Sequence, residues 1–344
     1  MSGRRYGARV KAYVSLWSAD LLGVRADVDR IDGVADGLHV DVFDGHEVPE
    51  LVFGPDFVAA LRAHTAALLD VHLAVEAPDA WAPRFAEAGA TVVDNSSQWR
   101  MEEDVPLVVA EVNPEALDGH RGIVANPNCT TMQTVVALKP ILDAAGIERV
   151  VMSSYQAVSG TGQKAVDELH SQAEAVIEAR ELPTPSVYPH QIAFNVLPQV
   201  ETFKDGDDYT TEERKCMSET RKILGREDIG VSATCVRVPV YTGHSVSANV
   251  QTREPLSPEE CREVLAAAPG VTVVDDPANG LYPTALDAAG RDDVLVGRIR
   301  RDPSHDRCLN LWIVSDNLRK GAATNAVQLA ELLSVRGLLR AARA

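Results

Sequence analysis

The sequence predicts an α/β fold in two parts: an amino-terminal layer of parallel strands and helices, and a later α+β domain on a mixed or antiparallel sheet. Up to about residue 150, short apolar runs alternate with amphipathic helical patterns, which is typical of βα units with parallel strands. Further on, two helical patterns precede strand-like runs with short, turn-rich connections, as in an antiparallel sheet. The end of the chain, 325–344, is an amphipathic pattern with a basic last turn, and we expect this helix to return to the amino-terminal domain.

The expected strands and helices follow from the period of the apolar residues and from glycine and proline at their ends. The strands expected in the first part are KAYVSL (11–16), GLHVDVF (37–43), LLDVHLAV (68–75), TVVDNSS (91–97), VPLVVAEV (105–112) and RVVMSSY (149–155), with helices at 55–68 and 78–89. In the later part, helices are expected at 165–182 and at 211–225, where Gly225 ends the second, and strands at 231–252, 271–276, 294–301 and 308–316.

The bulk composition excludes several classes of partner. Of the 344 residues, 45% are hydrophobic and 24% are charged, and the formal net charge is −17. Such a chain is repelled by nucleic acid and by anionic membranes. No apolar run approaches the ~18 residues that cross a bilayer, and the start has no signal-peptide pattern, so we expect a cytoplasmic protein. The five cysteines are widely spaced, which predicts reduced thiols and no zinc site.

The sharpest local signal is the hexapeptide NPNCTT at 126–131, followed by the apolar helical run MQTVVALKPIL. Pro127 interrupts the backbone before this helix and Asn128 is a suitable N-cap, which places Cys129 in the first turn. There the helix dipole and free backbone N–H groups favour a thiolate and lower its pKa, and a thiolate attacks acyl and aldehyde carbons. The alternative, a buried and inert cysteine, stays open on this motif alone.

A cysteine nucleophile needs a partner for proton transfer and groups that match the charges of its substrate. The candidates are Arg237 and His244 in a strand and turn, Glu212 and Lys215 on one helix face, and Gln156 with the turn Ser159–Gly160. Each has an ordinary structural alternative: a surface histidine, a solvated helix ion pair and a plain connecting loop. None of them indicates a function by itself.

Together, these stretches resemble aspartate-semialdehyde dehydrogenase over residues 91–344. The matching pieces occur in the family's order: VVDNSSQWRM, VPLVVAEVN, ANPNCTT, SSYQAVSGTGQKAVDEL, IAFNVLPQ, EERKCMSETRKILG, VRVPVYTGHS and NLRKGAATNAVQ. The resemblance implies a phosphorylating dehydrogenase of lysine, threonine and methionine biosynthesis, a homodimer that uses NADP. Cys129 would attack β-aspartyl phosphate to give a thioester, hydride from NADPH would reduce it, and aspartate semialdehyde would leave.

The same resemblance implies a role for each site residue. His244 would be the acid/base partner of Cys129, and Gln156 would orient the bound intermediate. The substrate would be held by Arg237 at its carboxylate, Glu212 at its ammonium, Arg100 and Lys215 at its phosphate, and Asn128 beside the nucleophile. The cofactor would contact Ser159, Gly160, Asn325 and Gln328. Arg214 departs from the family, which usually has a bulky apolar residue at this position.

Residues before about 90 do not fit that family. It opens with a strand and a glycine-rich turn, typical of a Rossmann fold, that holds the cofactor phosphates, whereas the first glycines here stand at 3, 7 and 23. The runs VSLWSADLLGV, GLHVDVFDGHEVPELVFGP and LLDVHLAVEAPDAWAPRFAEAGA resemble the beginning of ribulose-phosphate 3-epimerase, a (β/α)8 barrel. The amino-terminal layer therefore takes the Rossmann position with a barrel-derived sequence.

The epimerase-like part carries a candidate metal cluster. His39 and Asp41 alternate on one strand and so share a face, and His72 is expected on a neighbouring strand. Two histidines and an aspartate are able to bind a divalent metal, with Ser15 touching the substrate. A barrel needs eight strands to close, and this segment offers about three. We therefore expect no functional metal site, with these three residues as vestiges.

Three functions remain open: a semialdehyde dehydrogenase, an impaired hybrid that binds NADP poorly, and a metal-dependent epimerase. The predicted domains are a β/α segment at 1–90, the rest of the nucleotide-binding domain at 91–127 and 316–344, and a catalytic and dimerisation domain at 128–315. The stretch Ala86–Ala90 reads equally well in both families, which predicts the join there. The expected partner is a small-molecule substrate.

Overall fold

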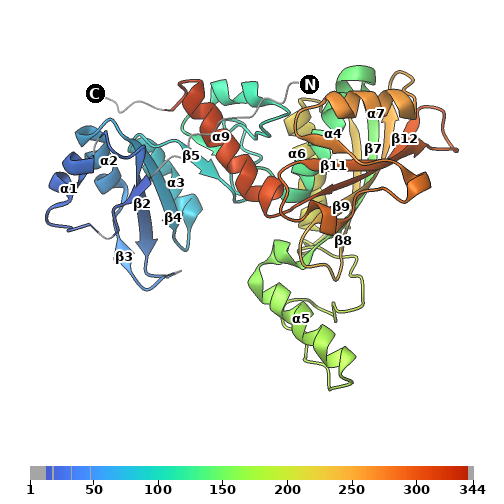
Figure 1. Ribbon diagram of the computed structural model, residues 1–344, viewed down its shortest axis with the longest axis horizontal. Helices are drawn as coiled ribbons and strands as arrows, with labels where there is room; N and C mark the ends of the chain where they lie inside the picture. The colour runs from blue at the N-terminus through green and yellow to red at the C-terminus, as the bar shows by residue number, and fades with distance from the viewer. Residues whose placement is uncertain (1–12, 18, 32, 47, 340–344) are drawn as a thin grey trace. The chain divides into compact units, whose positions relative to one another are not determined.

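The computed structural model describes residues 13–17, 19–31, 33–46 and 48–339 (Figure 1). The chain divides into two compact units. The first comprises residues 1–92, 121–123 and 339–344, and the second comprises 93–120 and 124–338. The units are described one at a time.

The first unit is a small α/β layer. Its central strand β2 (Gly37–Asp44) pairs in parallel with β1 (Tyr13–Ser15) and β4 (Leu68–Ala74), and its end pairs antiparallel with β3 (Leu51–Val52). Its helices are α1 (Val24–Ile31), α2 (Pro55–His64) and α3 (Pro78–Glu87). Both α2 and α3 begin with proline, whose missing N–H costs nothing at the first helical position. The predicted alternation of parallel strands and helices is confirmed.

The core of this unit forms around β2 because most of that strand is buried, as expected of a parallel strand covered on both faces. The buried side chains of the cluster are Leu16, Val28, Leu38, Val40, Val42, Val58, Leu61, Val75 and Phe85. The core therefore depends on apolar residues of β2, of the three helices and of the positions that directly follow β1 and β4.

The second unit is built on a six-stranded mixed sheet of order β10-β11-β12-β9-β7-β8. The strands are β7 (Ile147–Gln156), β8 (Gly230–Arg237), β9 (His244–Thr252), β10 (Val271–Val273), β11 (Val294–Arg301) and β12 (Cys308–Ser315). The inner pairs β11–β12, β12–β9 and β9–β7 are antiparallel, and the outer pairs β10–β11 and β7–β8 are parallel. The expected mixed sheet is confirmed.

Helices pack on this sheet and on the polypeptide around it (Figure 1). The main ones are α4 (Cys129–Ala145), α5 (Gln163–Ile177), α6 (Thr211–Leu224), α7 (Pro258–Ala267) and α9 (Thr324–Val335). Shorter elements are η1 (Pro114–Gly119), η2 (Val158–Thr161), η3 (Pro277–Asn279), α8 (Ala285–Ala288) and η4 (Arg319–Ala323), with β5 (Val92–Asp94) and β6 (Ile123–Ala125) as a separate two-stranded sheet. The carboxy-terminal helix α9 packs through Leu329 and Leu333 on Val108, Leu117 and Val124.

The two helices that bear predicted site residues have strong end signals. Helix α6 begins with a capping box between Thr210 and Glu213 and ends at Gly225, whose φ of 63° lies in the left-handed region that glycine adopts without strain. Helix α4 is capped by the side chain of Asn128, as predicted. The middle of α4 is buried on all sides, so its first turn is held firmly in place.

One predicted strand is wrong. The run at 105–112 makes only an isolated bridge, from Leu107 to Ala125. The chain then turns because Asn113 replaces strand pairing: its Oδ1 accepts from Val109 N at 2.9 Å, and its Nδ2 donates to the carbonyl of Leu107 at 2.9 Å. A side chain that satisfies the backbone in this way competes with a strand ladder.

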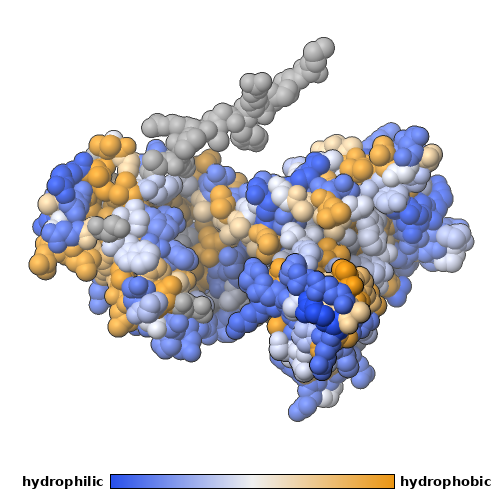
Figure 2. All heavy atoms as spheres, turned by 60° about the horizontal axis from the view of Figure 1, so that its bottom comes forward, coloured by the Kyte–Doolittle hydropathy of each residue, from blue (hydrophilic) through white to orange (hydrophobic). Residues whose placement is uncertain are grey.

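The surface gives no sign of a membrane span, since no helix among the described residues has the length and apolar character needed to cross a bilayer. Figure 2 shows one face, on which hydrophilic and hydrophobic residues alternate over short distances.

Replacing Asn113 with alanine should destabilise the second unit. The change leaves the buried N–H of Val109 and the carbonyl of Leu107 without partners, which costs about 2–3 kcal/mol. The free energy of unfolding in urea measures this effect, with the exposed Asn279→Ala as the matched control. Equal stability of the two variants would contradict the role given to Asn113.

Candidate active site

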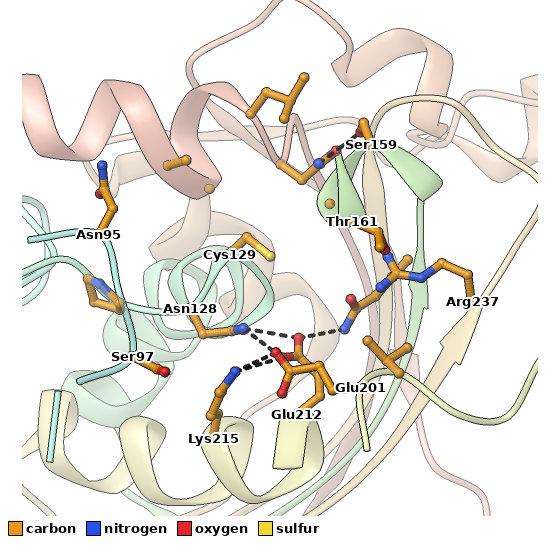
Figure 3. A pocket seen from close by; sticks show the side chains of 18 of the residues that line it. Asn95, Ser97, Asn128, Cys129, Ser159, Thr161, Glu201, Glu212, Lys215 and Arg237 are labelled. Atoms are coloured by element: carbon orange, nitrogen blue, oxygen red, sulfur yellow. Dashed lines mark hydrogen bonds and ion pairs between the residues drawn. The ribbon is translucent and has the colours of Figure 1, made fainter. Parts of the chain in front are cut away.

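A cavity of about 610 Å³ lies in the second unit, where the start of α4, the first half of α6 and the ends of β7 and β8 meet (Figure 3). The cavity lining includes most of the predicted catalytic, substrate and cofactor residues. These are Arg100, Asn128, Cys129, Gln156, Ser159, Gly160, Glu212, Lys215 and Arg237. The fold therefore brings together side chains that lie up to 137 positions apart, from Arg100 to Arg237.

Cys129 is the first residue of α4. The Oδ1 of Asn128 accepts from the backbone N–H groups of Thr130 and Thr131 at 2.9 and 3.1 Å, so two of the free N–H groups of this helix start are satisfied by the cap. The predicted lowering of the Cys129 pKa is wrong. Burial and the nearby charge of Glu212 raise the pKa of the thiol to about 12, against the smaller opposing effect of Arg237.

Glu212 is the centre of the polar contacts at the floor of the cavity. Its carboxylate accepts from Asn128 Nδ2 at 3.0 Å and from Gln156 Nε2 at 2.9 Å, and Lys215 Nζ lies 3.9 Å from it. The residue is only 3% exposed. A buried carboxylate is stable only with such partners, and its remaining capacity suits a cationic group of a substrate.

Arg237 and His244 stand beside one backbone segment. Arg237 Nη1 donates to the carbonyl of Ala157 at 2.7 Å, and its guanidinium lies 5.8 Å from the ring centroid of Tyr188, within the range of a cation–π contact. Its Nε is buried with no hydrogen-bond partner among the described residues. A fork-shaped guanidinium with a free donor suits a carboxylate ligand.

His244 is fully buried and does not line the cavity itself. Its Nδ1 accepts from Ala157 N at 3.1 Å, and its Nε2 is buried without a partner among the described residues. Burial and the charge of Arg237 lower the pKa of His244 well below its usual value, so the ring is neutral. Because Nδ1 is an acceptor, the proton is assigned to Nε2, where it is available for donation.

Two glycines allow close approach around these groups. A Cβ atom at Gly160 would lie 3.3 Å from both Arg237 Nη1 and His244 Nε2, and one at Gly321 would lie 2.9 Å from the Cβ of Cys129. Any larger residue at either position would crowd the catalytic candidates. This is why glycine stands at both positions.

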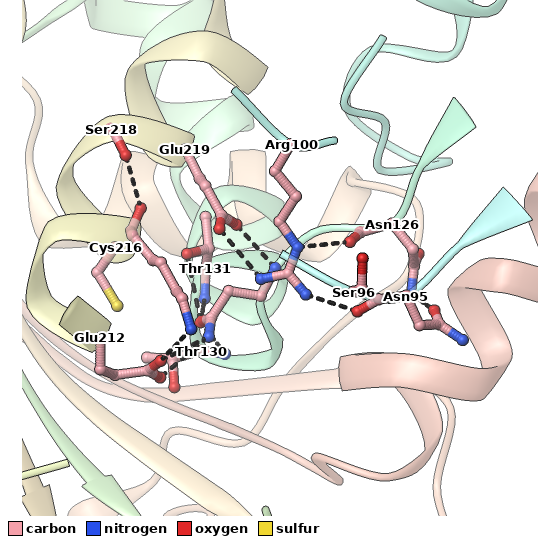
Figure 4. Close-up of polar contacts among 12 residues, drawn as sticks. Asn95, Ser96, Arg100, Asn126, Thr130, Thr131, Glu212, Cys216, Ser218 and Glu219 are labelled. Carbon is pink, nitrogen blue, oxygen red and sulfur yellow. Dashed lines mark hydrogen bonds and ion pairs between the residues drawn. The ribbon is translucent and has the colours of Figure 1, made fainter. Parts of the chain in front are cut away.

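A second polar network joins Arg100 and Glu219 to the segment before α4 (Figure 4). Arg100 donates to the backbone carbonyls of Asn126 and Asn95 at 3.0 and 2.8 Å and to Glu219 at 3.1 Å. The other carboxylate oxygen of Glu219 accepts from the backbone N of Asn128 at 2.7 Å. Three of the five N–H groups of the guanidinium are therefore engaged, and two remain for a ligand.

The structure places two predicted cofactor residues elsewhere. Asn325 is fully buried and bonds to Ala110 N, to Val108 O and to Asn126 Oδ1. Gln328 accepts from the buried Lys320 at 2.8 Å. Neither lines the cavity. Their amides instead hold the packing of α9.

The sequence reasoning missed Glu219, Tyr188 and Glu201. Glu219 stands seven residues after Glu212 on α6, a spacing that returns to the same helix face, so this signal was available. Tyr188 and Glu201 lie in irregular segments that line the cavity. No periodicity marks such positions.

In the first unit, the candidate metal cluster assembles as the strand pattern predicts. One ligand atom from each of His39, Asp41 and His72 lies within 4.8 Å of the others. Asp41 pairs across the sheet with His72, and the carboxylate of Asp70 accepts from His39 Nδ1 at 2.8 Å. The donor set suits a divalent cation.

The turn after β1 does not fit the phosphates of a dinucleotide. Residues 16–23 contain the single glycine Gly23. The backbone N–H of Leu22 already donates to Asp20 Oδ1 at 3.0 Å, and that of Asp20 donates to Asp27 Oδ2 at 3.3 Å. A phosphate-binding turn needs free N–H groups and no nearby carboxylates. In this turn, two N–H groups are already bonded to aspartate carboxylates, whose charge would repel a phosphate.

The second unit, by contrast, places a cysteine at a capped helix start within a polar cavity, and its class follows from comparison with known proteins. The family profile described as semialdehyde dehydrogenase, dimerisation domain, matches residues 138–320.

Similar proteins agree with this class. A curated aspartate-semialdehyde dehydrogenase of Aquifex aeolicus is 58% identical over 261 residues, which is 75% of this chain and 76% of that protein. The Bacillus subtilis enzyme of the same name is 49% identical over 74% of this chain and 75% of its own length. The crystal structure of aspartate semialdehyde dehydrogenase II from Vibrio cholerae superposes with a TM-score of 0.77 at 38% identity, covering 95% of this chain and 99% of that one. The chain belongs to the aspartate-semialdehyde dehydrogenase family.

The resemblance of the amino-terminal part to another family is also confirmed. The profile of the ribulose-phosphate 3 epimerase family matches residues 11–181. This match extends beyond residue 90, where the epimerase-like sequence was expected to end, and overlaps the dehydrogenase match from 138 to 181.

Replacing Glu219 with glutamine should impair the site without unfolding it. The amide offers one acceptor where the carboxylate serves both Arg100 and Asn128 N, so kcat should fall about tenfold or more as the nucleophile loses its position. Phosphate KM should rise as well, because Arg100 loses its anchor. Alkylation of Cys129, followed by mass spectrometry, reports the displaced nucleophile without turnover.

The matched control for this change is Ser218→Ala, next to Glu219 on the same helix. Wild-type kinetics and alkylation in Glu219→Gln, or an equal change in Ser218→Ala, would show that Glu219 does not position the site.

Proposed function

We propose that this chain catalyses the reversible, phosphate-releasing conversion of β-aspartyl phosphate to aspartate semialdehyde through a thioester on Cys129. The observation that carries the proposal is the placement of Cys129 at the capped start of α4, within one cavity that also contains Glu212, Arg237 and Lys215. The Vibrio cholerae relative has been solved in complex with ASA, which supports a small-molecule substrate of this kind.

The charges of the cavity match the three charged groups of that substrate. Arg237, with its free buried donor, takes the α-carboxylate, and Glu212 takes the ammonium. Arg100 and Lys215 take the phosphate. Opposite charges held at fixed positions select both the substrate and its orientation.

Substrate binding also activates the nucleophile. Glu212 is one of the causes of the raised pKa of Cys129, and a substrate ammonium beside Glu212 offsets that negative charge. The pKa of Cys129 then falls and the thiolate attacks the acyl carbon. The C–S bond forms, the C–O bond to phosphate breaks, and the proton of the thiol leaves with the phosphate as HPO4²⁻. Gln156, anchored on Glu212, orients the acyl group, and His244 offers its Nε2 proton to the oxygen that gains negative charge.

NADPH, when bound, would supply the hydride that reduces the thioester, and NADP would accept it in the reverse direction. Ser159 and Gly160 line the cavity where the nicotinamide half would lie, and Ser159 is held by Asn317 Nδ2 at 3.0 Å. The turn after β1 gives no matching site for the phosphates. We therefore propose that NADP binds weakly, through contacts of the second unit.

The homodimer implied by the family uses the face of the six-stranded sheet that α4, α6 and α7 leave free. Ser245, Ser247 and Trp312 line a cavity of about 390 Å³ together with Tyr282 and Arg298. Aromatic and arginine side chains of this kind are common at protein interfaces. The matched dimerisation profile supports this assignment.

Purified protein should reduce NADP when aspartate semialdehyde and phosphate are added together, as measured by absorbance of the reduced nicotinamide. Cys129→Ala should lower kcat by about 10⁴-fold or more because the covalent step is lost. Cys308→Ala, which removes a thiol at the start of β12, is the control.

Two other results would decide against the proposal. Turnover that survives in Cys129→Ala would exclude the thioester. No wild-type turnover at saturating NADP, with Cys129 still alkylated faster than the other thiols, would identify the impaired hybrid.

The assembled cluster His39, Asp41 and His72 favours metal binding in the first unit. We propose that these side chains bind Zn²⁺ or Fe²⁺ weakly but do not support epimerisation, because the described first unit has only the strands β1 to β4 and no closed barrel. Calorimetry with Zn²⁺ should show binding that His72→Ala abolishes. An epimerase assay with either metal should remain at background, and measurable epimerisation would overturn this argument.

A further inference from the structure

Glu201 is an acidic residue at an unexpected position, inside the cavity that is to receive phosphate (Figure 3). It lies in the irregular segment before α6 and has a φ of 63°, a left-handed conformation that is strained for a residue other than glycine. One carboxylate oxygen accepts from Lys215 Nζ and the other from Thr211 Oγ1, each at 2.5 Å.

The positive groups of the anion subsite act on Glu201. Partial burial works to raise its pKa, but hydrogen bonds from Lys215 and Thr211 and the charges of Lys215 and Arg100 outweigh this effect, so the pKa of Glu201 is lowered. Glu201 is therefore an anion at neutral pH. It lies close enough to both proposed phosphate ligands to feel their charge.

The contacts of Lys215 distinguish its two acidic neighbours. Its ammonium lies 3.9 Å from Glu212 but 2.5 Å from Glu201. The side chain of Glu212 is 4% exposed, whereas that of Glu201 is 38% exposed. Glu201 is thus the carboxylate that holds the ammonium and also the one with a route to water.

From this geometry we propose that Glu201 is an internal counter-ion that occupies the phosphate subsite and must leave Lys215 when phosphate enters. The inference rests on the proposed function for its assignment of Arg100 and Lys215 to the phosphate. Two anions compete for one ammonium, so Glu201 weakens the binding of phosphate and sets the concentration at which the subsite fills. Its strained backbone and exposed side chain allow this departure.

The test replaces Glu201 with glutamine, which keeps the size of the side chain and removes its charge. The dissociation constant for inorganic phosphate, measured by calorimetry on the whole protein, should fall about three- to tenfold. KM for phosphate in the NADP assay should fall by a similar factor. The matched control is Glu259→Gln on α7, since its side chain is 77% exposed and the change in net charge is the same.

A second experiment combines Glu201→Gln with Lys215→Met, which removes the ammonium for which Glu201 and phosphate compete. There the substitution should leave the phosphate dissociation constant unchanged. The inference is overturned if phosphate affinity rises equally in the Lys215→Met background or in Glu259→Gln. It is also overturned if Glu201→Gln alone fails to raise phosphate affinity, or if no variant binds phosphate.

The two proposals fail in different ways. If phosphate binds more tightly to Glu201→Gln while the wild type shows no NADP-dependent turnover, the counter-ion stands and the enzymatic proposal fails. If the wild type turns over and Glu201→Gln binds phosphate no better, the enzymatic proposal stands and the counter-ion fails.

Discussion

The start of α4 is held by two buried carboxylates of α6, and the arrangement of the site depends on this contact. Glu212 accepts from the side chain of Asn128, and Glu219 accepts from its backbone N–H. Because the same Asn128 caps α4, helix α6 fixes both the position of Cys129 and the geometry of its helix start. Buried carboxylates need such donors to be stable, so the contacts that stabilise the fold here are the same contacts that position the site residues.

This arrangement has an electrostatic consequence. Burial, followed by the charge of Glu212, raises the pKa of the Cys129 thiol to about 12. Arg237, which lines the cavity, and the neutral His244, which does not, both lie close to Gly160.

Much of the site was predictable because short motifs carry local geometry. The N-cap at Asn128, the end of α6 at Gly225 and the shared face of His39 and Asp41 follow from rules that span only a few residues. The pKa of Cys129 was not predictable, since it depends on burial and on Glu212, 83 positions away in the chain. The strand expected at 105–112 does not form because the side chain of Asn113 bonds to the backbone of Val109 and Leu107. The spacing of apolar residues carries no information about such side-chain hydrogen bonds.

The sequence by itself determined the alternation of elements, the ends of α4 and α6 at Asn128 and Gly225, and the two family resemblances, because each is written in neighbouring residues. Only the tertiary structure decided which side chains share the cavity. It placed Glu201 on Lys215, Glu219 beneath Asn128, and Asn325 away from the cavity lining. The physical reason is that charge, desolvation and packing act through space between distant segments, and a one-dimensional pattern carries no record of those distances.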